Sequence, residues 1–351
     1  MPYALDVTTR GARRARAVSA AAAAALAVAA ALYFYAPAAE TPLGSKDLCA
    51  AYGGLPADWR VNPRAGMVYL PGGKFTLGTT LGYLEERGEI ASHAPGFWID
   101  RTEVTVAQFA SFAAETGFVT QAEREGGGVV FVQPSEQDLA RQDYVWWQYV
   151  KGANWRRPQG GNSRAEPNQP VTLVTLGDAL AYAHWLGRDL PTELEWEYAA
   201  KAGHGGAQLE HEPRAADGAP AANFWQGEFP LQNTGEDGFQ GLAPVGCFAG
   251  NGFKLYDMVG NAWEQTKDVY TEDHQAGQTP VSIDSEPIQP QNLAMTVKGG
   301  SHLCGRNFCV RYRASAREAH EANLPLSHIG FRTVSREPAD WLTRLLQGGP
   351  A

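Results

Sequence analysis

The long stretch from Gly203 to Val334 limits the possible folds of this chain most strongly. It contains no sustained helical period, and short runs of β-forming residues alternate there with turns rich in glycine, proline and asparagine. The whole chain holds 39 glycines and 22 prolines, a composition that favours a loop-rich fold over a helical bundle. We therefore predict an irregular α+β fold.

Three helices are predicted before this stretch. The clearest begins after Thr192, where Glu195 three residues later completes a capping box, and it ends at Gly203. A cap of this kind stabilises a helix by about 1 kcal/mol. The other two helices are expected from Val106 to Gly117 and from Thr175 to Gly187, because each has apolar residues on one face and a glycine at its end.

The N-terminal segment has the pattern of an export signal. A basic stretch, Arg10–Arg16, precedes a run without charges, Ala17–Ala39. Its apolar part is longer than the roughly 7–15 residues of a signal core and close to the roughly 20 that span a bilayer. A cleavage site is available at Ala36–Ala38, but we favour an uncleaved anchor at residues 1–39 that places the rest in the periplasm or outside the cell.

After this anchor we expect a linker at 40–60, one domain at 61–335 and a tail at 336–351. Residues 1–38 carry four arginines and one aspartate, so the remainder of the chain has a net charge of −12 when the whole is −9. Such an acidic body lacks the basic footprint that phosphate backbones require. Nucleic acid is therefore excluded as a partner, and we expect a monomer.

Four cysteines are too few for a disulfide framework in an exported chain of 351 residues. Cys49 lies in the expected linker and Cys247 in the run PVGCFAG. These two are either buried free thiols or a pair with each other. The sequence leaves both possibilities open.

The other two cysteines, Cys304 and Cys309, are separated by four residues in VKGGSHLCGRNFCVRYR. A disulfide there closes a short loop and contributes only about 2 kcal/mol. Zinc-finger spacing and the C-x-x-C motif are absent, while two thiolates suit a soft ion such as copper(I). Flanking arginines favour thiolates; they are Arg306, Arg311 and Arg313. Spacing alone favours the disulfide in an exported protein.

Hard oxygen donors lie among glycines in a different part of the chain. Asn223, Asp237 and Asp257 belong to the stretches ANFWQGEFPLQNTGEDGFQG and LYDMVGNAWEQTKD. Such donors suit calcium, although the spacing is not that of an EF-hand. Ordinary turn residues are the alternative explanation.

These stretches together carry a family resemblance. The segments YVKGANWRRPQG, LPTELEWEYAAKAG, ANFWQGEFP, NTGEDGFQG, NAWEQTKD, VKGGSHLCGRNFCVRYR and HIGFR follow one another between about Gly66 and Arg332. In this order they resemble the formylglycine-generating enzymes, also called sulfatase-modifying factors. The paired cysteines after GGS are the most specific part, whereas LPTELEWEYAA marks only the wider superfamily.

The resemblance implies a reaction, its partners and a fold. Enzymes of this family use dioxygen and a thiol reductant to convert the cysteine of a C-x-P-x-R motif into Cα-formylglycine. Their partner is an unfolded or nascent sulfatase, and copper(I) and structural calcium are their metals. The implied fold is a modified C-type-lectin-like α+β domain, irregular and loop-rich, with a single catalytic domain.

The resemblance also implies roles for individual residues of this chain. Cys304 and Cys309 hold copper(I), and Ser301 and Trp263 line the same site. Two sets of residues, several of them through backbone carbonyls, hold calcium: Asn223, Phe224, Asp237 and Phe239, and Asp257, Met258, Gly260 and Ala262. The aromatic run DYVWWQYVKGANW is a candidate wall for a peptide groove, with core packing as its alternative.

The chain departs from the vertebrate form of this family at several positions. Gly305, Phe308 and His328 replace residues that are histidine, tyrosine and asparagine there. Alternatives are a superfamily member that acts on another substrate, such as a siderophore-maturation enzyme of the periplasm, and a non-catalytic lectin-like binding module. The same superfamily includes mononuclear-iron enzymes of sulfur metabolism. These need a histidine-rich site on an H-x3-H-x-E helix, and this motif is absent from the sequence.

Overall fold

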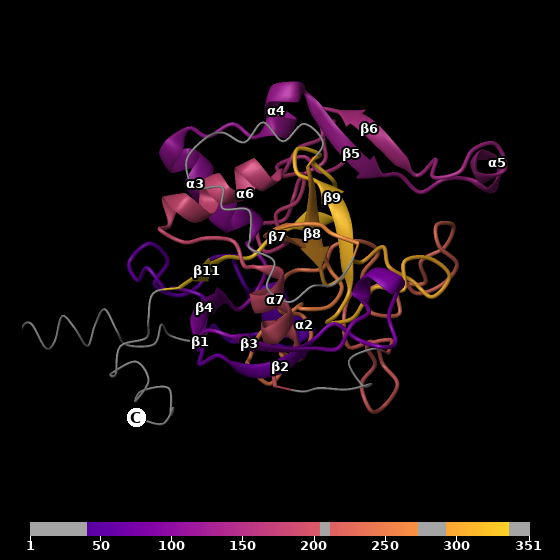
Figure 1. Ribbon diagram of the computed structural model, residues 1–351. Coiled ribbons are helices and arrows are strands. Elements are labelled where there is room, and N and C mark those ends of the chain that lie inside the picture. Colours follow the sequence, from indigo (N-terminus) through magenta and orange to yellow (C-terminus); the bar gives the residue numbers. More distant parts are fainter. Residues whose placement is uncertain (1–40, 204–210, 273–292, 337–351) are drawn as a thin grey trace, which may run out of the picture. The chain divides into compact units, whose positions relative to one another are not determined.

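The computed structural model describes residues 41–203, 211–272 and 293–336, which belong to one folded unit (Figure 1). The expected membrane anchor at 1–39 and nearly all of the expected tail lie outside the described residues. No helix among the residues described is long and apolar enough to cross a membrane.

The described part contains short helices and short strands. The helices are α2 (Lys46–Ala51), α3 (Val106–Thr116), α4 (Gln121–Glu125), α5 (Glu136–Leu139), α6 (Leu176–Trp185), α7 (Glu193–Lys201) and the 3-10 turn η1 (Leu84–Glu86). The strands are β1 (Met67–Leu70), β2 (Gly73–Leu77), β3 (Ile90–Ala94), β4 (Phe97–Asp100), β5 (Gly127–Phe131), β6 (Trp147–Lys151), β7 (Trp263–Val269), β8 (Ala294–Lys298), β9 (Arg317–Glu321), β10 (Ile329–Gly330) and β11 (Val334–Ser335). This confirms the predicted irregular α+β class.

The three predicted helices are α3, α6 and α7. Each begins at a threonine whose side chain completes a capping box, so local sequence determines where these helices start. Gly117 ends α3 in the left-handed conformation, as predicted. For α7 the prediction was one residue late, because Ala202 and not Gly203 caps the helix, with φ of 47°.

Two sheets organise the unit. One has the order β10–β7–β8–β9, in which β7, β8 and β9 are antiparallel and β10 adds in parallel to β7. The other has the order β1–β4–β11, so the first and last strands of the domain share the partner β4. This closure joins the two ends of the stretch from 67 to 335 in one domain.

The remaining strands form two antiparallel hairpins, β2–β3 and β5–β6. Figure 1 shows β5 and β6 extending away from the sheet that contains β7, β8 and β9, with α5 near the tip. Helices α3 and α6 lie side by side at the base of this arm. Trp146, just before β6, packs on Phe229 and Phe308 of the body of the domain.

The largest core cluster joins α3 and α6 to residues far apart in the sequence. Phe109 packs on Trp155, on Tyr182 and on Phe331, with ring centroids 5.1, 5.8 and 6.5 Å apart. Arg332 is fully buried beside this cluster and donates to both carboxylate oxygens of Glu264, at 2.6 Å each. A buried arginine requires such a paired carboxylate because an isolated charge would be costly there.

The segment expected to be a linker is partly helical and is attached to the domain. Cys49 on α2 forms a disulfide with Cys247, with 4.9 Å between the Cα atoms. Both sulfurs pack with Ala243 and Phe248. The sequence had left this pairing open. Disulfides are typical of chains that fold outside the cytoplasm.

Candidate active site

The second cysteine pair lies on a loop that follows β8. Two glycines with positive φ, Gly299 and Gly300, turn the chain after the strand. A Cβ atom on Gly300 would lie 2.5 Å from the carbonyl oxygen of Arg311, so only glycine allows the two sides of the loop to approach this closely. The loop closes on itself, and the Cα atoms of Cys304 and Cys309 are 4.7 Å apart in a disulfide.

The two sulfurs differ in access. Cys304 is buried at 1 % exposure, whereas Cys309 and its neighbours Phe308 and Val310 are only partly buried. Residues Arg306 and Asn307, between the two cysteines, are exposed. The pair is therefore anchored in the core on one side and reaches the surface on the other.

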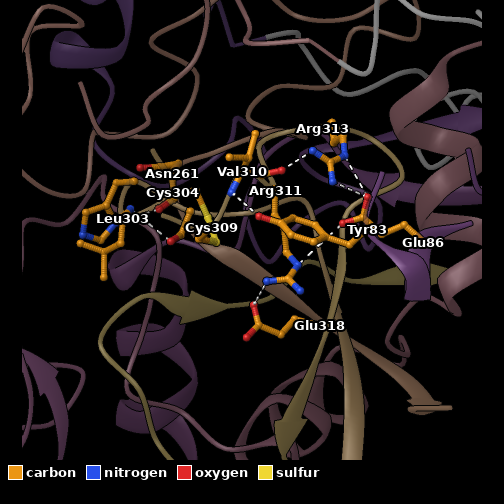
Figure 2. The surroundings of a disulfide bond; sticks show 12 residues. Tyr83, Glu86, Asn261, Leu303, Cys304, Cys309, Val310, Arg311, Arg313 and Glu318 are labelled. Carbon is orange, nitrogen blue, oxygen red and sulfur yellow. Dashed lines mark hydrogen bonds and ion pairs between the residues drawn. A yellow bond between two sulfur atoms is a disulfide. The ribbon is translucent and has the colours of Figure 1, made fainter. Parts of the chain in front are cut away.

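The chain after Cys309 is clamped by the segment around η1 (Figure 2). The Tyr83 hydroxyl accepts a hydrogen bond from the backbone N–H of Val310 at 3.1 Å. The guanidinium of Arg311 lies 4.2 Å from the centre of the Tyr83 ring and pairs with Glu85. Arg313 pairs with Glu86, whose side chain is fully buried. These contacts fix the direction in which the chain leaves Cys309.

Each arginine near the pair faces a carboxylate. Burial raises the pKa of Glu86, and the charge of Arg313 counteracts that rise. Arg306 pairs with Glu212. From the sequence, the positive charge of these arginines was expected to favour thiolates. The paired carboxylates offset much of that charge.

The predicted residues Ser301 and Trp263 lie in the same region as the pair. Ser301 is fully buried; its hydroxyl accepts from the N–H of Leu303 at 3.2 Å and its carbonyl from the N–H of Cys304 at 3.0 Å. Trp263 begins β7 and packs in one apolar cluster with Cys304 and Cys309. The tertiary structure thus brings all four predicted residues together.

Two buried histidines adjoin this cluster, and sequence reasoning assigned neither of them a role in the site. The Nδ1 atom of His302 lies 3.0 Å from the carbonyl oxygen of Asn261. The ring of His328 stacks on Trp147 with centroids 4.7 Å apart, and the Nδ1 atom of His328 has no partner among the residues described. Burial lowers the pKa of His302 to about 4 and lowers that of His328 well below its usual value, so both rings are neutral at pH 7.

An aromatic cluster covers the other side of the loop. Phe308 stacks on Phe229 with ring centroids 4.3 Å apart and meets Trp146 edge-on at 5.5 Å. Trp146 thus contacts Phe308 of the cysteine loop and Trp147 stacks on His328, while the peptide groove itself stays a prediction. Trp155, from the same run, packs in the main core instead, which is the alternative that the sequence analysis left open.

The first predicted calcium set is assembled around Asp237. One carboxylate oxygen accepts from the N–H of Phe224 at 3.2 Å and the other from the N–H of Phe239 at 2.8 Å. Asn223 donates through its side-chain amide to the carbonyl of Gly241 at 2.9 Å. Burial raises the pKa of Asp237. All four predicted residues of this set therefore lie within one loop cluster.

The second predicted set, Asp257–Ala262, surrounds a group of buried carboxylates. Desolvation raises the pKa of Asp257 to about 6, and that of Glu103 is raised well above its usual value by burial and then by Asp257 and Glu264. The Oε2 atom of Glu103 is buried and has no partner among the described residues. Arg332 supplies a single positive charge here, and it is bound to Glu264.

No three Cys, His, Asp or Glu side chains of the described ranges form a group that would hold one metal ion. An ion at either loop would therefore also need backbone carbonyls or amide oxygens, which is how calcium is commonly bound. The left-handed conformations of Asp257, Gly260 and Asn261 turn the backbone sharply in the second set. The donor types at both loops fit a hard cation.

Comparison with known proteins identifies the family. Residues 54–337 match the model of the sulfatase-modifying factor enzyme 1-like domain. A formylglycine-generating enzyme of Bos taurus is 40 % identical over 291 residues, which cover 79 % of this chain and 76 % of that protein. One of Mycobacterium tuberculosis is 38 % identical over 291 residues, covering 77 % of this chain and 97 % of the relative.

Among solved structures, PvdO from Pseudomonas aeruginosa superposes with a TM-score of 0.55 and 23 % identity, covering 76 % of this chain and 93 % of that one. At this identity the likeness supports the fold alone. The sequence relatives go further, because their identity extends over most of both chains. The chain therefore belongs to the sulfatase-modifying factor family, and the two sequence relatives described above are formylglycine-generating enzymes.

Proposed function

We propose that this protein oxidises the cysteine of a C-x-P-x-R motif in a sulfatase polypeptide to Cα-formylglycine. The observation that carries the proposal is the cysteine pair on a loop that reaches the surface, in a chain about 40 % identical to enzymes of that name. A site at the surface suits a polypeptide substrate, because an extended chain reaches a groove more easily than a deep pocket.

Cys304 and Cys309 are the residues that would hold copper(I). An external thiol first reduces their disulfide, and the two resulting thiols lie close enough to bind one soft ion together. Copper(I) bound there would supply electron transfer to dioxygen and a third position for the substrate sulfur. Ser301 and Leu303 hold the backbone before Cys304, and the clamp from Tyr83 holds the backbone after Cys309.

The overall reaction requires dioxygen and a thiol reductant. The substrate side chain CH2–SH loses two hydrogens and becomes CH=S, while two external thiols lose two more and form a disulfide. These four hydrogens and one dioxygen form two waters. A further water then converts CH=S to the aldehyde CH=O and releases hydrogen sulfide. The buried neutral rings of His302 and His328 and the indole of Trp263 keep bulk water from the inner side of the site.

Peptide mass spectrometry tests this proposal directly. A peptide with C-x-P-x-R, incubated with the protein, copper, oxygen and a thiol, should lose roughly 18 Da as the thiol becomes an aldehyde. Reduced protein should also take up about one copper(I) per chain, which is measurable without turnover. A folded, copper-loaded protein that leaves the peptide unchanged would contradict the substrate assignment.

We also propose that calcium stabilises the loops around Asp237 and Asp257. An ion that binds only the native state stabilises it by mass action, by about 2.7 kcal/mol when its concentration is 100 times Kd. The buried carboxylates support this because a cation would offset their mutual repulsion. Removal of calcium by a chelator should lower Tm, and readdition should restore it. A Tm that is constant across a wide calcium range would contradict both sites.

For the N-terminal segment we propose export of the catalytic domain, with residues 1–39 as its anchor. The basic stretch before the apolar run supports this orientation, and so do the two disulfides. A C-terminal reporter that is active only after export should give signal. Activity of a reporter that works only in the cytoplasm would contradict the proposal.

A further inference from the structure

Three exposed apolar side chains gather in the loop between β2 and β3, where η1 begins. Leu81 is 59 % exposed, Tyr83 37 % and Leu84 77 %. Elsewhere in the part of the chain that the structure describes, no two exposed large apolar residues lie within four consecutive positions. We call these three residues the apolar loop. Concentrated apolar surface of this kind is typical of a site that binds a partner.

Direct contacts join the apolar loop to the cysteine pair. The Tyr83 hydroxyl accepts from the backbone N–H of Val310 at 3.1 Å, and Val310 is the residue that follows Cys309 (Figure 2). Val310 is partly buried and packs against the same apolar cluster as Cys309. Apolar groups therefore continue from Cys309 through Val310 to Tyr83, and Leu84 follows Tyr83 in the chain.

The residues after the apolar loop are fixed in place. Glu85, which follows Leu84, pairs with Arg311, and the Arg311 guanidinium lies 4.2 Å from the centre of the Tyr83 ring. Glu86 comes next and is fully buried. Because an ion pair and burial hold this segment, the apolar loop presents its side chains at a defined position beside the cysteine pair.

Charge distinguishes the possible partners of the apolar loop. From residue 81 to residue 89 the chain carries three glutamates and one arginine, a net charge of −2. A membrane surface with anionic lipids attracts Lys and Arg and would repel this segment. A second copy of the chain, packed about a two-fold axis, would bring the same carboxylates together. An unfolded polypeptide fits better, because it exposes apolar side chains that its own folding buries.

We propose that the apolar loop is a docking surface for the unfolded sulfatase polypeptide, which it binds through apolar side chains outside the C-x-P-x-R segment. The proposal rests on the proposed function, because a polypeptide that places its cysteine at Cys309 extends over the neighbouring surface on both sides. A folded sulfatase buries most of its apolar side chains. The apolar loop therefore favours the unfolded chain over the folded one.

Two peptides that share one motif test the docking surface by binding. Both contain S-x-P-x-R, in which serine replaces the reacting cysteine and prevents oxidation; the residues on both sides are rich in leucine in one peptide and in serine in the other. Fluorescence anisotropy on the copper-free full-length chain measures Kd. The wild type should bind the leucine-flanked peptide about ten-fold more tightly, the effect of burying about one leucine side chain. Replacing both leucines, with Leu81→Ser and Leu84→Ser, should reduce this ratio to about one.

A matched control separates the apolar loop from apolar surface in general. Val61→Ser also removes an exposed apolar side chain, next to Arg60, which pairs with Glu115 of α3. This variant should keep the ten-fold ratio, and thermal unfolding should show that it and the double variant are folded. The single change Leu84→Ser, at the most exposed of the three residues, should lower the ratio part of the way. Loss of the ratio in Val61→Ser as well would overturn the proposal.

Two further measurements test the other partners. Sedimentation velocity should give the same oligomeric state for the wild type and the double leucine variant. Both should also bind equally to vesicles that contain phosphatidylglycerol. Self-association that disappears in the double variant would assign the apolar loop to a second copy of the chain. Vesicle binding that disappears would assign it to lipid, and either result would overturn the proposal.

Oxidation distinguishes a failure of this inference from a failure of the proposed function. With cysteine in place of serine, the wild type should convert the leucine-flanked peptide with a kcat/KM about ten-fold higher than that of the serine-flanked peptide. If both peptides are converted but the wild type binds them equally, the oxidation stands and the docking surface is wrong. If neither is converted but the binding ratio is present and is lost in the double variant, the oxidation is wrong and the docking surface stands. A wild type that binds neither peptide also overturns the docking surface.

Discussion

The two disulfides of this protein have opposite surroundings. Cys49–Cys247 joins residues 198 positions apart, and its sulfurs are buried among small and aromatic side chains. Cys304–Cys309 spans only 5 positions and lies on a surface loop between charged and aromatic groups. By chain entropy the first contributes about 5 kcal/mol to stability and the second about 2 kcal/mol. The first pair therefore serves the fold, whereas we propose that the second serves the chemistry.

The largest expected effect comes from breaking the second pair. Cys304→Ser or Cys309→Ser should each reduce peptide oxidation to the uncatalysed background, because one thiolate does not hold the ion in the required geometry. The free energy of unfolding should fall by only about 2 kcal/mol. Mass spectrometry of the peptide and urea denaturation measure the two quantities on the same samples. Oxidation that survives in either variant would contradict the two-thiolate site.

The next effect is on stability. Replacement of both Cys49 and Cys247 by serine should lower the free energy of unfolding by about 5 kcal/mol, because the unfolded chain then gains the freedom of a long loop. Peptide oxidation per folded molecule should stay near that of the wild type. Urea denaturation at neutral pH measures the change. A stability loss no larger than that of the Cys304 variants would show that loop length does not distinguish the pairs.

Differential labelling provides a control for both variants. Mild thiol treatment followed by alkylation should label Cys309 but leave Cys49 and Cys247 unlabelled in the native protein. The reason is access, since Cys49 and Cys247 are 1 % and 3 % exposed, whereas Cys309 is only partly buried.

A smaller effect is expected from the clamp that holds the second pair. Glu86→Gln removes the negative charge that pairs with the buried guanidinium of Arg313. Breaking a buried pair costs about 3–5 kcal/mol, so this isosteric change should lower the free energy of unfolding by about 3 kcal/mol. KM for the peptide should also rise, because the chain after Cys309 is less well fixed. The exposed pair Arg60–Glu115 is the control, and Glu115→Gln should cost less than about 1 kcal/mol.

Acidification should give the smallest of these effects. His320 on β9, in the sheet whose strand β8 leads into the second pair, is buried, and desolvation lowers its pKa to about 4. The unfolded chain therefore binds a proton between about pH 6.5 and 4 that the folded chain excludes, and stability is lost as pH falls through this range. His320→Gln should flatten the decline by up to about 3 kcal/mol, or less if the native state relaxes. Parallel curves of wild type and variant would refute the assignment.

The sequence was sufficient where information is local. Thr105, Thr175 and Thr192 start helices because a threonine three residues before a glutamine or carboxylate forms a capping box regardless of the rest of the chain. The C-x4-C spacing was equally local, and Cys304 and Cys309 are close because so few residues separate them. The irregular α+β class followed from the alternation of turns and short strands after Gly203.

The tertiary structure decided which distant groups meet. Sequence could not show that Cys49 pairs with Cys247, that Tyr83 and Glu86 clamp the chain after Cys309, or that Glu228 touches Asn307. These contacts form only when the loops close and many residues are buried together in the folded domain. Periodicity and capping act over a few residues through the backbone, whereas long-range contacts depend on the packing of the whole domain. The family motifs identify Cys304 and Cys309, and only the packed structure surrounds them with paired charges and neutral histidines.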